Sequence, residues 1–117
     1  MDSHQLTQKL RDFTGTETWF RHQLNRNMLY TEGVQFFAEA AGCYWFLDIA
    51  ATEYMQLQAT QPFLLLVLES VQGKAIITVE DGDGSVIVAK HLDFTSCPEG
   101  RWCFYLTNNT MLLPTEY

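Results

Sequence analysis

The stretch that decides the fold is LYTEGVQFFAEAAGCYWFLD, residues 29–48, which is rich in aromatic side chains and nearly free of charge. Thr31 offers a hydroxyl group to the first free backbone amides of a helix, and Glu32 places negative charge at the positive end of the helix dipole. From Val34 to Ile49 the apolar side chains recur on one wide stripe. The pattern predicts a single long helix that organises a core. Gly42 lies inside this pattern, where glycine costs roughly 1 kcal/mol relative to alanine, so we expect it to serve close packing.

Two shorter elements are expected before this helix. Ser3 is the predicted N-cap of a first short helix, in which apolar residues recur at helical spacing as far as Phe13, and Gly15 is expected to end it. Residues 17–30 alternate loosely between polar and apolar, which predicts two short extended pieces around Asn25-Arg26-Asn27.

The chain after Pro62 has the pattern of an antiparallel sheet. Strands are predicted at residues 63–71, 74–80, 85–92, 101–106 and 111–113. Asp-Gly-Asp-Gly at 81–84 and Asn-Asn at 108–109 are typical of hairpin turns. Because the side chains of a strand repeat every two residues, one face is expected to meet the long helix, with Ile77, Val79, Val86 and Val88 on it.

Length and composition fit one domain. The chain has 117 residues, of which 47% are hydrophobic, and no Pro- or Gly-rich linker divides it. The predicted fold class is therefore α+β: an antiparallel β-meander of four to six strands packed on one long and one short helix, with residues 1–117 as a single α+β domain.

The charge and the ends of the chain narrow the classes of partner. A formal net charge of -7 opposes direct binding to nucleic acid or to anionic lipid. The first ten residues lack the basic and apolar regions of a secretory signal, and no apolar run is long enough to cross a bilayer. We therefore expect a cytoplasmic protein with no membrane contact.

The candidate partner-binding residues are acidic or aromatic. Glu80, Asp81 and Asp83 form the only local concentration of acids, which is either a soluble hairpin turn or an acidic mimic of nucleic acid. The same turn resembles the start of a calcium loop, but its twelfth position is Leu92, where such a loop supplies a glutamate. Trp19, Trp45 and Trp102 are expected in the core, and an exposed tryptophan would anchor a protein partner, for which Trp19 and Trp102 are the candidates.

Signals for catalysis are weak. Cys43, Cys97 and Cys103 lack the paired spacing of a metal site, and reduced thiols are expected, with a disulfide between Cys97 and Cys103 the less favoured alternative. Only Cys97 lies in a predicted loop, where a nucleophile is accessible. Asp48 and Glu39 flank the apolar stripe, and each is expected to pair with an arginine such as Arg21 or Arg26, or with an indole N–H, more readily than to act as a general acid or base. No cofactor or metal site is predicted.

Several segments together resemble a known family. They are FTGTE (13–17), LYTEGV (29–34), AEAAG (38–42), WFLDI (45–49) and LPTEY (113–117). In these the chain is similar, over nearly its whole length, to the uncharacterised bacterial domain-of-unknown-function family numbered sixty-eight seventy-six. The resemblance implies a small single-domain protein, often carried on plasmids, phages and other mobile DNA, with no catalytic residues to transfer. At Thr95-Ser96-Cys97-Pro98 the chain departs from the Thr-Asp-Phe-Pro run of that family, which weakens a catalytic role for Cys97.

These observations favour a non-enzymatic acidic protein-binding module, expected to be an inhibitor or accessory factor of the anti-defence type that a mobile element uses against a host protein or nucleoprotein complex. Two alternatives stay open. One is a small enzyme that uses Cys97 or a carboxylate of the long helix. The other is a structural homodimer joined along an exposed strand.

Overall fold

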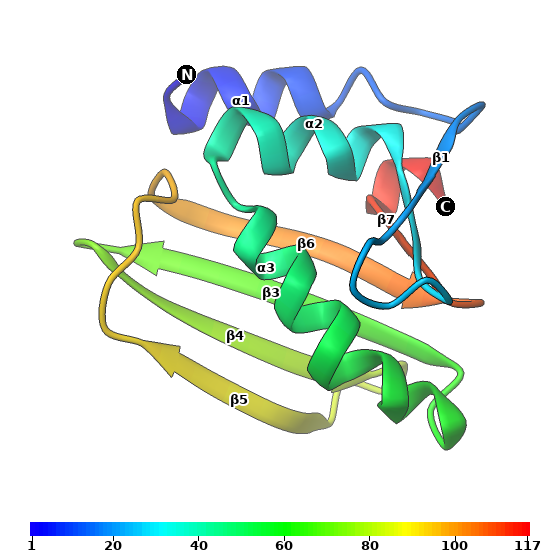
Figure 1. The fold of residues 1–117 in the computed structure, drawn as a ribbon. Coiled ribbons are helices and arrows are strands. Elements are labelled where there is room, and N and C mark those ends of the chain that lie inside the picture. Colours follow the sequence, from blue (N-terminus) through cyan, green and yellow to red (C-terminus); the bar gives the residue numbers. More distant parts are fainter.

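The computed structural model describes residues 1–117 and shows one seven-stranded sheet with helices on one of its faces (Figure 1). The predicted α+β class, with helices on one side, is confirmed. The strands are β1 (Trp19–Arg21), β2 (Leu29–Thr31), β3 (Phe63–Val71), β4 (Lys74–Asp81), β5 (Val86–Leu92), β6 (Gly100–Thr107) and β7 (Thr110–Leu112). The helices are α1 (Ser3–Leu10), α2 (Glu32–Ala41) and α3 (Tyr44–Ile49), with a π-helical segment η1 (Ala50–Tyr54) and the 3₁₀ turns η2 (Met55–Ala59) and η3 (Pro114–Glu116).

The sheet is mixed and is only partly a meander. Its strand order is β1-β2-β7-β6-β3-β4-β5, so β6 returns across the sheet to pair with β3 instead of β5. β2 and β7 run parallel, which the antiparallel prediction did not include. The order has a physical reason: a simple meander would leave β3, the most apolar strand, at an edge, and the return of β6 gives it a neighbour on both sides.

The predicted long helix is two helices, and Gly42 separates them. Gly42 takes a left-handed conformation with φ of 66° at the end of α2, and nothing lies within 4 Å of the position that a Cβ would occupy. Its role is therefore to end the helix and not to allow close packing. The predicted N-cap is confirmed, because the Thr31 hydroxyl accepts a hydrogen bond from the backbone N–H of Val34.

Three smaller differences come from local geometry. The N-cap of α1 is Asp2, which accepts a hydrogen bond from the backbone of Gln5, and the helix ends at Leu10, before Gly15. The predicted pairing of two extended pieces around Asn25-Arg26-Asn27 is confirmed by β1 and β2. A bulge in the β4–β5 ladder pairs Val86 with Glu80, which turns Val86 away from the helices, so its prediction on the helix-facing side is wrong.

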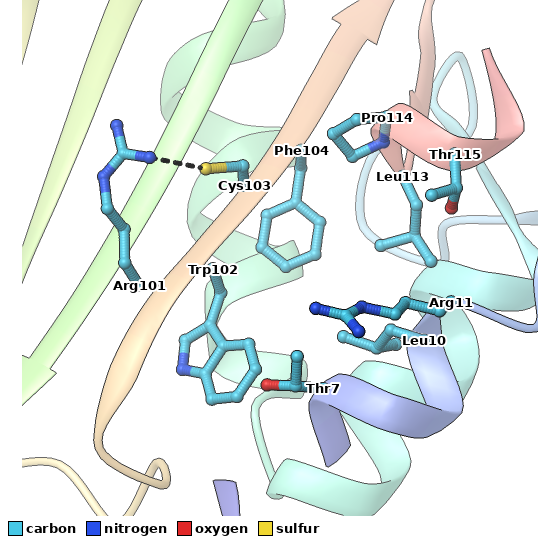
Figure 2. A pocket seen from close by; sticks show the side chains of 10 residues that line it. All are labelled: Thr7, Leu10, Arg11, Arg101, Trp102, Cys103, Phe104, Leu113, Pro114 and Thr115. Atoms are coloured by element: carbon cyan, nitrogen blue, oxygen red, sulfur yellow. Dashed lines mark hydrogen bonds between the residues drawn. The ribbon is translucent and has the colours of Figure 1, made fainter. Parts of the chain in front are cut away.

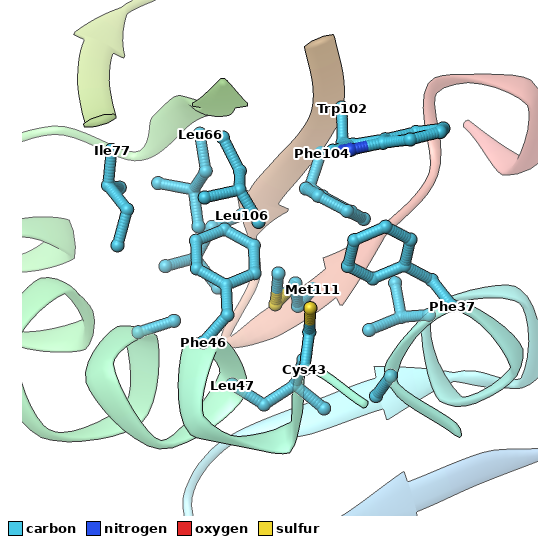
Figure 3. Close-up of a cluster of buried hydrophobic side chains, with 14 of the residues drawn as sticks. Phe37, Cys43, Phe46, Leu47, Leu66, Ile77, Trp102, Phe104, Leu106 and Met111 are labelled. Atoms are coloured by element: carbon cyan, nitrogen blue, oxygen red, sulfur yellow. The ribbon is translucent and has the colours of Figure 1, made fainter. Parts of the chain in front are cut away.

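The core lies between the sheet and the helices. Phe37 of α2 and Phe46 of α3 both face Phe104 of β6, with ring centroids 4.9 and 5.2 Å apart respectively (Figure 3). Leucine and isoleucine side chains from the neighbouring strands, such as Leu66 and Ile77, complete this cluster and are fully buried. The aromatic residues that made the 29–48 stretch conspicuous therefore serve to hold the sheet.

The Glu116 carboxylate ties both ends of the chain to the start of α2. It accepts hydrogen bonds from the hydroxyl groups of Thr31 at 2.7 Å and Thr16 at 2.9 Å. It also accepts from the backbone N–H groups of Leu113 at 3.0 Å and Gly33 at 3.3 Å. A Cβ at Gly33 would lie 2.7 Å from both the Glu116 carboxylate and the Leu113 side chain. Any larger residue at position 33 would therefore displace the Glu116 carboxylate or the Leu113 side chain from its present place.

We expect Glu116→Gln to lower the free energy of unfolding by about 1–3 kcal/mol, because the amide replaces an acceptor oxygen by a donor among four donors and removes negative charge from a helix N-terminus. Urea denaturation would measure the loss. The matched control is Glu17→Gln, since the exposed Glu17 carboxylate makes no hydrogen bond in the structure, and it should leave the midpoint unchanged. Equal midpoints for the two variants would contradict the role of Glu116.

Candidate functional site

One face of the sheet carries apolar side chains that no helix covers. Along β3, Leu64, Leu66 and Leu68 point into the core, and the residues between them point to the opposite side. Figure 1 shows every helix on the core side. We call the opposite side the open face, and its side chains on the central strands are Phe63, Leu65, Val67, Glu69, Val71, Lys74, Ile76, Thr78, Glu80, Arg101, Cys103, Tyr105 and Thr107.

An aromatic cluster lies at one end of the open face. The ring of Tyr117 packs edge-on against Phe63 and Tyr105, with centroids 5.7 and 5.3 Å apart. Phe63 and Tyr105 are themselves 4.8 Å apart. Tyr117 remains 75% exposed, so the cluster presents a broad aromatic surface to solvent. Clusters of this kind are typical of the contact residues that anchor protein interfaces.

Trp19 extends this surface toward the sheet edge. It is 52% exposed, and it lines a shallow cleft of about 240 Å³ together with Leu112 and Tyr117. Trp19 is therefore the exposed tryptophan that could anchor a protein partner, and it lies beside the aromatic Tyr117. Trp45 is partly buried against the core, as expected.

Trp102 does not reach the surface. It is 5% exposed, its indole N–H donates to the carbonyl of Pro98, and its ring packs 5.7 Å from that of Phe37. Because alternate residues of β6 point to opposite faces, Trp102 faces the helices while Arg101 and Cys103 lie on the open face. As folded, it offers no anchor to a partner.

The predicted acidic cluster is divided between the open face and a turn. Glu80 lies on the open face opposite Leu65. The Asp81 carboxylate accepts the backbone N–H groups of Asp83 at 2.8 Å and Ser85 at 3.0 Å, so it closes the β4–β5 turn. β1 and β4 are five strand spacings apart in the sheet order, or about 24 Å, so Trp19 and Glu80 do not form one small site.

Cys97 is not the accessible loop thiol that the sequence suggested. It is 6% exposed, and the neighbouring Cys43 thiol and Trp102 indole lower its pKa against the opposing effect of burial. The neighbouring Cys97, together with burial, raises the pKa of Cys43. All three cysteines are free thiols, so the alternative disulfide between Cys97 and Cys103 is absent. Its burial leaves Cys97 no access to a substrate.

The helix carboxylates pair with partners other than those expected. Asp48 accepts a hydrogen bond from Nε2 of His22 at 2.8 Å, in place of an arginine. Nδ1 of the same ring accepts backbone N–H groups from Leu24 and Asn25, so both ring nitrogens are engaged. The pair holds the β1–β2 loop against α3 beside a cavity of about 510 Å³, and the His22 ring has no nitrogen left to act as a base there.

Glu39 likewise has a partner. Its carboxylate accepts from the Tyr44 hydroxyl at 2.9 Å, and burial together with this hydrogen bond raises the pKa of Tyr44 to about 12. Burial, with the Asp48 charge, also raises the pKa of Tyr30. These contacts fasten the two helices and the loop to one another.

No group of three or more His, Cys, Asp or Glu side chains converges to hold a metal ion. None of the helices has the length and apolar character that a membrane span needs.

The open face was detectable in the sequence through the run Phe63–Leu68, which is apolar at every position, whereas the residues of a half-exposed strand alternate between apolar and polar. The Glu116 contacts and the His22–Asp48 pair, which join residues far apart in the chain, gave no local signal.

The fold and the open face define a class: a small α+β protein with a mixed sheet that is covered by helices on one side only. The chain belongs to the family of unknown function DUF6876, whose family model matches residues 4–117. Comparison with curated proteins and with solved structures gave no significant match. Three of the five segments that carried the family resemblance, 13–17, 29–34 and 113–117, meet in space around Glu116, since Thr16, Thr31, Gly33 and Leu113 belong to them.

Cys103 gives a direct readout of the open face. It is half-buried there, whereas Cys43 and Cys97 are buried in the core, so we expect iodoacetamide to alkylate Cys103 first. Burial raises the pKa of Cys103, although the nearby Arg101 charge lowers it in part. Since the thiolate is the nucleophile, the alkylation rate should still be rising with pH at pH 9. Peptide mapping by mass spectrometry would measure the order, and labelling of Cys97 before Cys103 would contradict this assignment.

Proposed function

We propose that this chain is a non-enzymatic protein-binding module whose partner covers the open face. The observation that carries the proposal is the two-sided apolar character of β3. A central strand with Leu64 and Leu66 on one side and Leu65 and Val67 on the other has the composition of a strand buried on both faces. Helices cover only the side of Leu64 and Leu66. On the other side Val67 is already buried among its neighbours on the sheet, Leu65 is half-buried, and Ile76 is 40% exposed, so a partner would cover Leu65 and Ile76.

The shape of the open face favours a protein partner over a small molecule. A small-molecule site is a concave pocket that encloses most of its ligand. The open face is instead the surface of several adjacent strands, and its aromatic residues Phe63, Tyr105 and Tyr117 are of the types enriched at protein interfaces. Catalysis finds less support, because Cys97 is buried and both nitrogens of His22 are engaged.

A second copy of the chain is the alternative partner for the open face, and the balance of charges on that face is compatible with it. On β3, β4 and β6 the open face bears two acids, Glu69 and Glu80, and two bases, Lys74 and Arg101. A balanced face does not repel its own copy, although the whole chain has a net charge of -7. Such a dimer would pack face to face, unlike the strand-edge dimer considered from the sequence.

The narrower role expected from the family resemblance is an anti-defence inhibitor or accessory factor of a mobile element. In this role the partner that covers the open face would be a host protein or nucleoprotein complex. This role stays a prediction, as does a cytoplasmic location.

Ile76→Lys should weaken partner binding, because it replaces an apolar contact of the open face, at a position that is 40% exposed and opposite Glu69, by a charge that binding would have to desolvate. The matched control is Leu24→Lys, which adds the same charge at a 69% exposed site in the β1–β2 loop. Tagged proteins would be compared by affinity purification from a bacterial lysate with quantified stoichiometry, and by sedimentation of the purified protein.

A near-stoichiometric partner retained by wild type and Leu24→Lys but lost from Ile76→Lys would support the heterologous partner. A dimer that becomes monomeric only in Ile76→Lys would support the second copy. A monomeric wild-type protein that retains no partner beyond the Ile76→Lys level would contradict the proposal.

A further inference from the structure

The edge of β6 has an unpaired segment beside a cleft. β7 pairs with β6 only from Tyr105 to Thr107, so the segment Gly100–Phe104 has a neighbouring strand, β3, on one side alone. On the other side a cleft of about 220 Å³ separates it from α1 (Figure 2). A second cleft of about 340 Å³ continues along α1 past Gly100. We call the two together the edge cleft.

The hairpin geometry shows which backbone groups face the edge cleft. Thr107 and Thr110 flank a two-residue turn, so they exchange their backbone hydrogen bonds across the β6–β7 hairpin. Alternation along β6 then directs the N–H and C=O groups of Cys103 and Arg101 toward the same side. Beyond the end of β7 that side holds no strand. None of the backbone hydrogen bonds outside the helices and ladders involves either residue.

The floor of the edge cleft is apolar. Leu10 of α1, Trp102 and Phe104 of β6, and Leu113 line it, as Figure 2 shows. Leu10 is partly exposed, whereas the other three are buried. A strand placed beside Gly100–Phe104 would direct every second side chain onto this floor. Five strand residues span about 17 Å, so the site accommodates a short extended segment.

The rim of the edge cleft is positive in a protein that is otherwise acidic. Arg11 and Arg101 both line it, and neither takes part in a salt bridge. The one acid on the lining is Glu99, whose carboxylate already accepts the backbone N–H of Gln72 at 2.8 Å. The Arg101 guanidinium donates a hydrogen bond to Sγ of Cys103 at 3.2 Å, but neither arginine has an acidic partner. In a chain with a net charge of -7, these two positive charges beside open strand groups select a negatively charged occupant.

We propose that the edge cleft binds an extended acidic segment of a partner protein, which adds to the sheet as a strand along Gly100–Phe104. Its backbone pairs with Arg101 and Cys103, its apolar side chains pack on the partly exposed Leu10, and its carboxylates bind Arg11 on the helix side and Arg101 on the open-face side. The site is distinct from the core of the open face. It stands whether or not that face has a partner.

The test is selection from a displayed library of random octapeptides on the immobilised full-length protein. Enriched peptides are expected to alternate apolar and acidic residues. The affinity of a synthesised winner is measured by fluorescence anisotropy. Arg11→Gln and Arg101→Gln should each weaken binding about tenfold, as expected for loss of a charge-assisted contact. Arg26→Gln is the matched control, because Arg26 is an exposed arginine of the β1–β2 loop whose side chain makes no ion pair, and it should bind like wild type.

If the peptide adds to the sheet as a strand, the backbone N–H groups of every second peptide residue must bond to β6. N-methylation should abolish binding at alternate residues, whose N–H groups face β6, and be tolerated at the residues between. Binding unchanged in Ile76→Lys would place the peptide away from the open face. The proposal is overturned if no peptide is enriched over an Arg11→Gln/Arg101→Gln double variant, or if N-methylation has the same effect at every residue. A wild-type dimer lost in Arg11→Gln would also overturn it, since the edge cleft would then hold a second copy.

Discussion

The Glu116 carboxylate is the contact on which the arrangement of the chain depends. Its four donors come from the loop before β1, from the end of β2, from the first turn of α2 and from the segment after β7. The carboxylate therefore fixes where α2 begins and holds the parallel pairing of β2 with β7. Placed at the N-terminus of α2, it also gains from the helix dipole. Without it, the first 31 residues would be attached to the rest of the sheet mainly through the short β2–β7 ladder.

The second constraint on the fold is the apolar composition of β3. A strand that is apolar at every position from Phe63 to Leu68 is most stable in the middle of a sheet. β6 crosses over and pairs with β3, so that β3 lies between β6 and β4. The helices that follow from residues 32 to 59 suffice for one face only. The composition of β3 thus explains both the strand order and the apolar open face, so the fold and the proposed interaction surface have one cause.

Local signals predicted local structure well. Thr31 as a helix cap, Asn108 and Asn109 at positive φ, and the acidic turn after β4 all followed from the chemistry of a few neighbouring residues. The errors arose where distant residues decide. Gly42 ends a helix because α3 must turn to follow the sheet, and the apolar pattern alone did not record that change of direction. The partner of Asp48, His22, lies 26 residues away and was equally invisible.

The acidity of the chain and its apolar open face have separate roles. On the central strands of the open face the acids and bases balance, so most of the net charge of -7 lies in the loops and on the helix side. Charge distributed there keeps the free protein soluble although one sheet face is apolar. It also leaves the contact surface without a net charge. Affinity can then come from burial of the aromatic cluster, whereas the acidic surroundings influence how fast partners of different charge approach.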